Sequence, residues 1–137
     1  MQYWLVKSEP DAYSWQDFVK EGKAVWDGVR NYQARNNLRE MKKGDLVLFY
    51  HSVSSREVVG MARVSHEHYP DPTTRDDRWL VVELVPEMHF QKPVSLAQIK
   101  ADERLSQIAL IKQSRLSVMP LEKEHFDAIV ELGHPDA

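Results

Sequence analysis

Five consecutive apolar residues, Leu46 to Tyr50, constrain the fold more than any other stretch of this sequence. A strand with one face in solvent alternates between apolar and polar residues, and this stretch does not alternate. Its Val, Phe and Tyr residues favour a strand over a helix. We therefore predict a strand over residues 45–51 that is covered on both faces, so the fold must place other elements on each side of the sheet.

Strand-like and helix-like stretches follow one another along the rest of the chain. Strands are predicted over residues 2–7, 57–66, 79–86 and 115–119, and Gly60 indicates a bulge or a close backbone approach within one of them. Helices are predicted over residues 15–21, from 31 or 32 to 41, 95–100 and 121–132, with helical or mixed structure over 105–111. Residues 69–78 are rich in turn formers and predict a loop. The expected class is α/β (α+β), a mixed sheet or partly closed barrel flanked by short α-helices, with the strand order open.

Capping residues support several of these helix boundaries. Ser14 with Asp17, and Ser95 with Gln98, have the spacing of capping boxes at helix N-termini. Three glycines are placed to end helices, namely Gly22, Gly44 and Gly133.

Length and composition indicate one domain over residues 1–137, because neither a repeat nor a flexible linker divides the chain. The absence of cysteine excludes disulfides, a thiol nucleophile and any cysteine-ligated metal. No apolar stretch approaches the roughly 20 residues that span a bilayer, and the first residues lack the pattern of a signal peptide. We expect a cytoplasmic protein with no membrane partner, no metal and no cofactor.

Charge is distributed unevenly along the chain. The net charge of −3 disfavours a protein that coats nucleic acid through bulk positive charge. Residues 30–43 nevertheless hold five basic side chains against Glu40 alone, whereas the last sixteen residues are acidic. Two ordinary solvated faces would explain this pattern, and so would a local phosphate contact by Arg30, Arg35 and Arg39.

Four segments mix aromatic or apolar residues with hydrogen-bonding groups in a way that packing alone does not require. They span residues 7–10, 26–36, 49–52 and 113–118. A planar polar ligand such as a base needs an aromatic face to stack on and donors or acceptors at its edge. We predict a ligand pocket formed by Lys7, Ser8, Glu9, Trp26, Asp27, Gly28, Val29, Asn31, Tyr50, His51, Ser114, Arg115 and Ser117.

Three of these residues have more than one interpretation. Trp26 precedes a turn and can stack on a ligand, or it can fill the core, as tryptophan usually does. Asn31 can read a base edge or cap the second helix. Arg115 can hold a phosphate or a carbonyl edge, or pair with a carboxylate.

Catalytic and metal-binding interpretations are weaker. Adjacent strand residues point to opposite faces, so His51 and Ser52 are poorly placed to share a proton. The carboxylates of Glu9, Asp27 and Asp45 can act as acid or base, but no spacing defines a pair among them. His66 and His68 share a strand face without a third ligand nearby, which favours a solvated edge over a metal site.

The segments that suggest a pocket resemble the signature blocks of the EVE domain family, which includes the thymocyte nuclear protein family and many small bacterial proteins. The matching blocks lie at residues 3–10, 26–36, 41–45, 49–52 and 114–118, in the order of the family, and the similarity covers nearly the whole chain. The resemblance implies a PUA-like fold, a mixed β pseudo-barrel with helices at its rim. It also implies a relation to YTH domains, which hold a methylated adenine in an aromatic cage, with Ser8 and Trp26 as matching positions.

The chain departs from the YTH pattern at one wall of that cage. An aliphatic residue near Val82 stands where YTH domains supply a second tryptophan. The second wall must therefore come from another residue, for which Tyr50 and Tyr32 are candidates, or the cage is incomplete.

These observations lead to three hypotheses about function. The first is a non-enzymatic reader that takes one modified base of DNA or RNA into the pocket, with Trp26 stacked on it and Ser8 and Asn31 at its edge. The second is a nucleotide-directed or nucleic-acid-directed enzyme that uses Glu9, Asp27 or His51 as acid or base. The third is a binder of a small planar ligand that never meets a polymer, which the acidic net charge favours.

Overall fold

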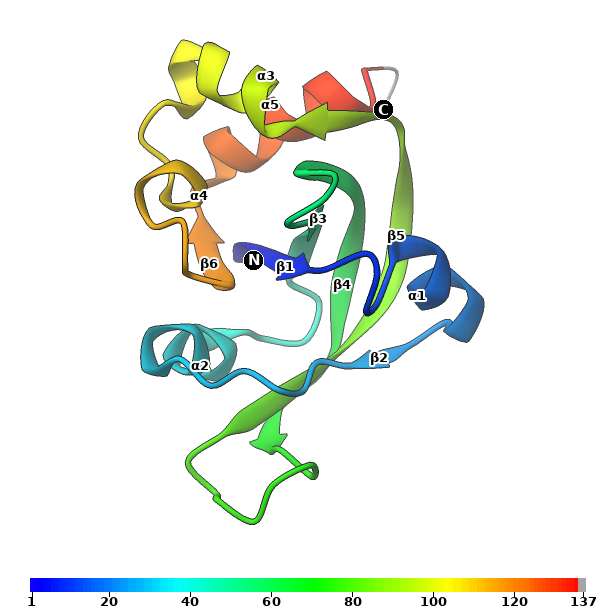
Figure 1. Cartoon of the computed structure of the whole chain (residues 1–137), viewed down its shortest axis with the longest axis vertical. Coiled ribbons are helices and arrows are strands. Elements are labelled where there is room, and N and C mark those ends of the chain that lie inside the picture. Colours follow the sequence, from blue (N-terminus) through cyan, green and yellow to red (C-terminus); the bar gives the residue numbers. More distant parts are fainter. Residues whose placement is uncertain (136–137) are drawn as a thin grey trace.

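The computed structural model describes residues 1–135, and its centre is the predicted apolar strand. This strand, β3, covers Leu46–His51, and five of its six residues are buried. It lies inside a six-stranded mixed sheet with the order β2-β5-β4-β3-β1-β6 (Figure 1). The prediction of a mixed sheet flanked by short helices is confirmed.

The other strands place both ends of the chain next to β3. Their bounds are Tyr3–Ser8 for β1, Ala24–Val25 for β2, Glu57–Pro70 for β4, Leu80–Ser95 for β5 and Val118–Leu121 for β6. β1 runs parallel to β3, and every other neighbouring pair is antiparallel. The two-residue strand β2 was not predicted, because two residues carry no detectable periodicity.

The hairpin of β4 and β5 is longer than the sequence predicts. Pro86, taken as the end of a strand, lies within β5 opposite Ala62, next to a register shift between Met61 and Ala62. A bulge leaves one residue unpaired in the ladder, so proline is tolerated there without the loss of a hydrogen bond. Tertiary pairing thus carries the strand through a residue that ordinarily ends one.

Gly60 combines both features that its position predicts. The register of β4 against β5 shifts between Val58 and Gly60. The indole of Trp15 also covers Gly60 so closely that a Cβ there would lie 2.5 Å from two ring carbons. Glycine is therefore required for helix α1 to pack on the sheet.

Within residues 1–135, the chain forms five short α-helices and one 3-10 helix. The α-helices lie around the sheet (Figure 1). Their bounds are Trp15–Glu21 for α1, Tyr32–Glu40 for α2, Leu96–Ala101 for α3, Glu103–Leu105 for the 3-10 helix, Ala109–Lys112 for α4 and Lys123–Gly133 for α5. The two predicted capping boxes are present at α1 and α3. The left-handed C-cap predicted for α1 is Gly22, with φ of 77°.

Helix α2 closes the open side of the sheet. It contacts β5 and β6, which lie toward opposite edges of the strand order (Figure 1). The side-chain amide of Asn37 donates a hydrogen bond of 2.7 Å to the carbonyl of Val118 and fastens α2 to β6. The sheet and this helix together form the expected pseudo-barrel.

Three local predictions are corrected. The last strand begins at Val118, so Arg115 and Ser117 lie in the preceding turn rather than on a strand. Gly133 is the last residue of α5, where a Cβ would collide with the Phe90 ring, so it is required for packing. Gly44 lies in the turn between α2 and β3, three residues beyond the C-cap Met41.

Among residues 1–135, no helix is both long and apolar enough to cross a membrane.

Candidate ligand-binding site

A cavity of about 790 Å³ opens between the end of β1 and the segment that follows β2. Nine of the thirteen predicted pocket residues line it, namely Lys7, Ser8, Glu9, Trp26, Asp27, Gly28, Val29, Asn31 and Ser117. We refer to it as the Trp26 cavity. Three stretches far apart in the sequence meet here because β1 lies in the sheet next to β6, which Ser117 immediately precedes.

Trp26 forms an aromatic wall of this cavity. Its backbone N–H donates to the carbonyl of Val82 at 2.9 Å, which extends the β2–β5 pairing by one residue. The residue is 8% exposed, and its indole meets the Phe49 ring edge-on at 5.5 Å between centroids. Trp26 therefore belongs to the core and lines the cavity at the same time, so the two interpretations of this residue do not exclude each other.

The second aromatic wall is Tyr13, a residue that the sequence analysis did not select. Its ring lies 6.4 Å from the Trp26 ring at an interplanar angle of 73°, and it also lines the cavity. The candidates Tyr32 and Tyr50 do not line the Trp26 cavity, so this expectation is corrected. The signal available in the sequence was the position of Tyr13 just before the capping residue of α1, which brings it back toward the end of β1.

Burial and charge perturb the Tyr13 hydroxyl. Burial raises the pKa of the Tyr13 phenol, and the nearby carboxylates of Glu21 and Asp17 raise it further. Its oxygen is buried and has no hydrogen-bond partner among residues 1–135. The phenol therefore stays protonated at neutral pH, with the Glu21 carboxylate close to its hydroxyl.

Polar groups of the cavity are partly committed to the protein. The Ser8 hydroxyl donates to the carbonyl of Tyr13 at 2.6 Å, which leaves its oxygen free to accept. Asn31 caps α2, because its Oδ1 accepts from the N–H of Ala34 at 2.9 Å. The Asn31 side-chain NH₂ has no partner among the described residues, so capping leaves its donors available to a ligand.

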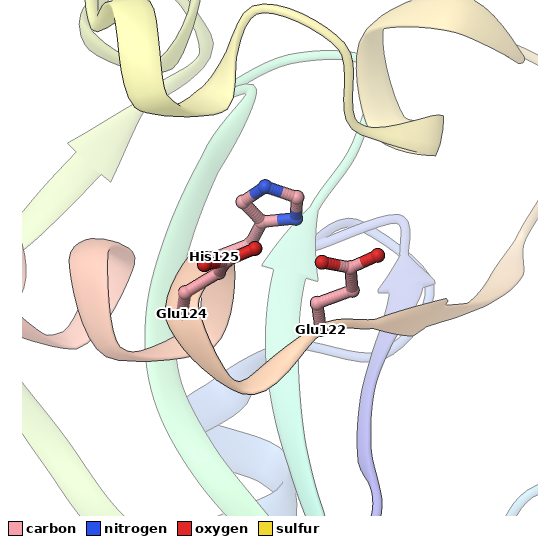
Figure 2. Close-up of side chains that lie close together, drawn as sticks. All are labelled: Glu122, Glu124 and His125. Carbon is pink, nitrogen blue, oxygen red and sulfur yellow. The ribbon is translucent and has the colours of Figure 1, made fainter.

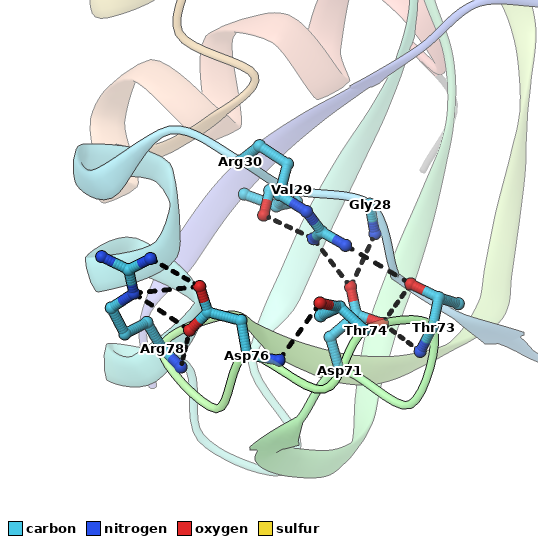
Figure 3. A network of polar contacts seen from close by, with 8 residues as sticks. All are labelled: Gly28, Val29, Arg30, Asp71, Thr73, Thr74, Asp76 and Arg78. Carbon is cyan, nitrogen blue, oxygen red and sulfur yellow. Dashed lines mark hydrogen bonds and ion pairs between the residues drawn. The ribbon is translucent and has the colours of Figure 1, made fainter.

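Asp71 holds residues 28–30, which line the Trp26 cavity, through the polar contacts drawn in Figure 3. Its buried carboxylate accepts from the N–H of Gly28 at 3.0 Å and from the guanidinium of Arg30 at 2.9 Å. It also accepts from the N–H and the hydroxyl of Thr73. Burial raises the pKa of Asp71, but the hydrogen bonds from Thr73, Gly28 and Arg30 outweigh it and lower the pKa to about 2.

Sequence reasoning missed Asp71 because it lies in a stretch that resembles an ordinary loop. The loop instead reaches across to the 28–30 segment and satisfies its donors (Figure 3). A buried, ionised carboxylate that accepts hydrogen bonds from several donors holds those donors in fixed positions.

The three predicted phosphate-binding arginines do not share one environment. Arg30 lines the cavity, but its guanidinium is paired with Asp71 and lies over the Trp79 ring. Arg35 donates to the carbonyl of Arg78 and lies over the Tyr32 ring. Arg39 is exposed on α2. Arg35 and Arg39 line neither this cavity nor its neighbour, and the phosphate role of all three stays a prediction.

A second cavity of about 580 Å³ adjoins the first and contains two more predicted residues, Tyr50 and Ser114. Burial raises the pKa of Tyr50, and the nearby positive charge of Arg56 opposes this effect. We refer to this space as the Arg56 cavity. The predicted single pocket is therefore two adjoining spaces.

His51 and Arg115, the remaining predicted pocket residues, lie outside both cavities. His51 is buried, and its Nε2 accepts a hydrogen bond of 3.0 Å from the backbone N–H of Trp15 at the start of α1. Burial lowers the pKa of His51, although Glu57 opposes this effect. Arg115 is exposed in the turn before β6.

The carboxylates considered for catalysis have different surroundings. Glu9 and Asp27 both line the Trp26 cavity. Asp45 is buried and accepts from the Trp4 indole at 3.0 Å and from the N–H of Lys42 at 2.9 Å, so it supports the turn before β3.

One cluster within residues 1–135 has the spacing of metal ligands, at the start of α5 (Figure 2). It consists of Glu122, Glu124 and His125, whose ligand atoms lie within 4.8 Å of one another. Both glutamates are exposed, and none of the three lines either cavity. His66 and His68 are exposed on β4, as expected for a solvated edge, and belong to no such cluster among the described residues.

Comparison with known proteins gives close relatives over nearly the whole chain. Thymocyte nuclear protein 1 of Mus musculus is 34% identical, with 95% of this chain and 73% of that protein covered. A crystal structure of a protein from Agrobacterium tumefaciens is 39% identical, with a TM-score of 0.96 and coverage of 100% of this chain and 97% of the other. "Nuclear" in the first name describes that relative, and a cytoplasmic location stays a prediction here.

A third relative was solved with a ligand. Human thymocyte nuclear protein 1, in complex with DNA that contains 5-methylcytosine, is 30% identical with a TM-score of 0.90 and covers 97% of this chain and 98% of that one. The family model described as the EVE domain matches residues 2–132. The order of sequence blocks, the six-stranded mixed sheet and these matches agree, and the chain belongs to the EVE domain family.

Proposed function

We propose that this protein is a reader of a modified base in DNA or RNA, which it binds in the Trp26 cavity without converting it chemically. The observation that carries the proposal is the pairing of two aromatic side chains with polar groups around one cavity. Trp26 and Tyr13 supply aromatic surface. The hydroxyl oxygen of Ser8 can still accept a hydrogen bond, and the side-chain NH₂ of Asn31 can still donate.

The dimensions and composition of the cavity suit a single nucleotide. Sites for small molecules commonly measure about 300 to 1,000 Å³ and combine apolar walls with a few placed polar groups. Stacking of a base on an aromatic side chain contributes about 1 to 3 kcal/mol. This gain is comparable to the few kcal/mol needed to extract a base from a duplex, so a modification or a single strand must tip the balance.

The human relative suggests the chemistry of the base. That protein was crystallised with DNA that contains 5-methylcytosine. The exocyclic amino group of cytosine can donate a hydrogen bond to a carboxylate. Two carboxylates that line the Trp26 cavity are those of Glu9 and Asp27. A methyl group at C5 adds apolar area that an indole can cover. We therefore place 5-methylcytosine first among the modifications to test.

Binding titrations test the proposal directly. Oligonucleotides that differ in one modified base are titrated as single strands and as duplexes, in DNA and in RNA. We expect one modification to bind more tightly than its unmodified partner. Equal affinity for every member of the series would contradict the reader function.

A tryptophan pair provides the matched control. Trp26→Ala is expected to weaken binding about 5-fold to 150-fold, the equivalent of 1 to 3 kcal/mol of stacking, while Trp26→Phe keeps part of it. Trp4→Phe changes a tryptophan that lines neither cavity and should leave affinity unchanged. Circular dichroism and thermal unfolding of each variant separate lost binding from lost folding. Mass spectrometry of the recovered ligand checks that it is unchanged, because a converted product would point to an enzyme.

A binder of free nucleosides is the second candidate, favoured by the charges of the cavity. Its lining balances Lys7, Lys23 and Arg30 against Glu9, Glu21 and Asp27, so it carries no excess positive charge for a polyanion. A thermal shift with free modified nucleosides but none with oligonucleotides would select this candidate over the reader.

A further inference from the structure

The Arg56 cavity continues directly from the Trp26 cavity. Lys7, Glu9 and Ser117 line both spaces, so the two meet at the end of β1. The other side of the Arg56 cavity is formed by the loop after β3 and by α3 and α4, through residues that include Ser52, Lys100 and Leu110. A strand that places one base beside Trp26 therefore finds a second hollow next to it.

The charge of the second hollow differs from that of the first. Its charged lining consists of Lys7, Arg56 and Lys100 against Glu9 alone, whereas the Trp26 cavity is balanced. In the described part of the chain, none of these three cations forms an ion pair. Arg30, by contrast, is paired with Asp71. Among residues 1–135, the positive charge near the site that no carboxylate neutralises thus lies in the Arg56 cavity, where the Nε of Arg56 donates only to the carbonyl of Val53, at 3.3 Å.

The loop that carries Arg56 has an unusual backbone. Val53 and Arg56 adopt φ of 69° and 52°, a region that residues other than glycine rarely occupy. The N–H of Ser52 donates to the carbonyl of Ser8 at 2.9 Å, which ties the loop to the Trp26 cavity. Such strained conformations cluster at ligand sites, where the surrounding structure holds them in place.

Lys7 lies at the junction of the two spaces. Its ammonium donates to the carbonyl of Ser114 at 2.8 Å and is partly removed from solvent. Burial lowers the pKa of Lys7, because the positive charge has lost water without gaining an anion. A bound anion would supply the negative charge that the Lys7 ammonium lacks as a partner.

We propose that the Arg56 cavity binds a backbone phosphate of the nucleic-acid strand whose base occupies the Trp26 cavity, through Lys7, Arg56 and Lys100. This proposal rests on the reader function and moves the phosphate contact from Arg30, Arg35 and Arg39 to the end of β1, the loop after β3 and α3. The guanidinium of Arg56 offers a planar pair of donors for phosphate oxygens, and the ammonium of Lys100 offers a mobile point charge.

The salt dependence of oligonucleotide affinity tests the assignment. Each phosphate contact to a single strand contributes about 0.7 to the slope of log K against log salt concentration. We expect Arg56→Gln and Lys100→Gln each to flatten the slope by about this amount, and Lys92→Gln, an exposed lysine on β5 outside both cavities, to leave it unchanged. Unchanged slopes for both Arg56→Gln and Lys100→Gln, or a loss seen with Arg39→Gln instead, would overturn the proposal.

A ligand series separates this proposal from the reader function. The modified nucleoside should bind Arg56→Gln as it binds the unaltered protein, because the nucleoside lacks a phosphate. The nucleoside 5′-monophosphate and a dinucleotide then distinguish a terminal phosphate from a backbone diester, and we expect the diester to respond to Arg56→Gln. If the protein binds modified and unmodified oligonucleotides equally, but Arg56→Gln and Lys100→Gln still flatten the salt slope, only the reader function is contradicted. If the protein prefers a modified base, but neither variant changes the salt slope, only the phosphate site is contradicted. If no oligonucleotide binds, both proposals are contradicted.

Discussion

At the scale of single residues, Asp71 is a buried carboxylate that fixes the 28–30 segment of the site. Its pKa falls from an ordinary 3.8 to about 2 because hydrogen bonds outweigh burial. A carboxylate with a lowered pKa stabilises the fold fully above 3.8, and this stabilisation is lost as the pH falls toward 2. The shift corresponds to roughly 2 kcal/mol. We expect Asp71→Asn to lower the free energy of unfolding at pH 7 by about that amount in urea denaturation.

The pH dependence provides the control for this prediction. Asp71→Asn cannot titrate, so the difference in stability between it and the unaltered protein should shrink between pH 4 and pH 2. Asp76→Asn alters a half-buried carboxylate that pairs with the exposed Arg78 in the same loop, and it should change stability much less. If the difference in free energy of unfolding between Asp71→Asn and the unaltered protein stays constant across this pH range, the charge of Asp71 does not contribute to stability.

Asn31 allows capping and ligand binding to be separated. Aspartate is as good an N-cap as asparagine, so Asn31→Asp should keep stability within about 0.5 kcal/mol, while Asn31→Ala should lose about 1 kcal/mol. The carboxylate lacks the amide donors and adds negative charge, so we expect Asn31→Asp to weaken oligonucleotide affinity about 3-fold to 10-fold. Unaltered affinity would place the amide outside the contact with the ligand.

At the scale of elements, His51 links the end of β3 to the start of α1. Burial lowers the pKa of His51 below the ordinary 6.5, so the folded protein favours the neutral ring that accepts from the N–H of Trp15. The unfolded chain takes up the proton first, and stability that is fully present above pH 6.5 is lost as the pH falls below it. We expect His51→Gln, which keeps an acceptor but does not titrate, to lose less stability than the unaltered protein between pH 7.5 and 5.5.

Thermal unfolding across this pH range checks the His51 prediction. His66→Gln is the matched control, because it makes the same substitution at an exposed histidine of β4. Identical pH profiles for His51→Gln and the unaltered protein would mean that the link between β3 and α1 does not depend on the charge of the ring.

Elements whose boundaries depend on local chemistry were predictable from sequence. Helix α1 begins and ends where Ser14 and Gly22 predict, and α3 begins at its predicted capping box. Elements that depend on distant pairing were not. Strand β5 continues past Pro86 because β4 supplies a bulge there, and Arg115 lies in a turn because β6 starts only where it meets β1.

At the scale of the whole molecule, the Trp26 cavity exists only when the domain is folded. Its walls come from residues 7–13, 21–31 and 117, which the unfolded chain does not hold together. A ligand that binds only the folded state at 100 times its Kd adds about 2.7 kcal/mol of stability. We expect the preferred oligonucleotide to raise the Tm of the unaltered protein by several degrees and that of Trp26→Ala by much less. An equal rise in both would locate binding outside this cavity.

Local sequence patterns determined the covered strand β3, the capped helices and most of the residues around the Trp26 cavity, because these depend on side-chain type and near spacing. The family followed from the resemblance of the sequence blocks. The tertiary structure decided the rest. It showed that Tyr13 rather than Tyr32 or Tyr50 faces Trp26, that Asp71 holds the 28–30 segment from across the fold, and that the expected pocket is two hollows. The physical reason is that these contacts join residues far apart in the chain, and their distances follow from strand order and register, which no local pattern contains.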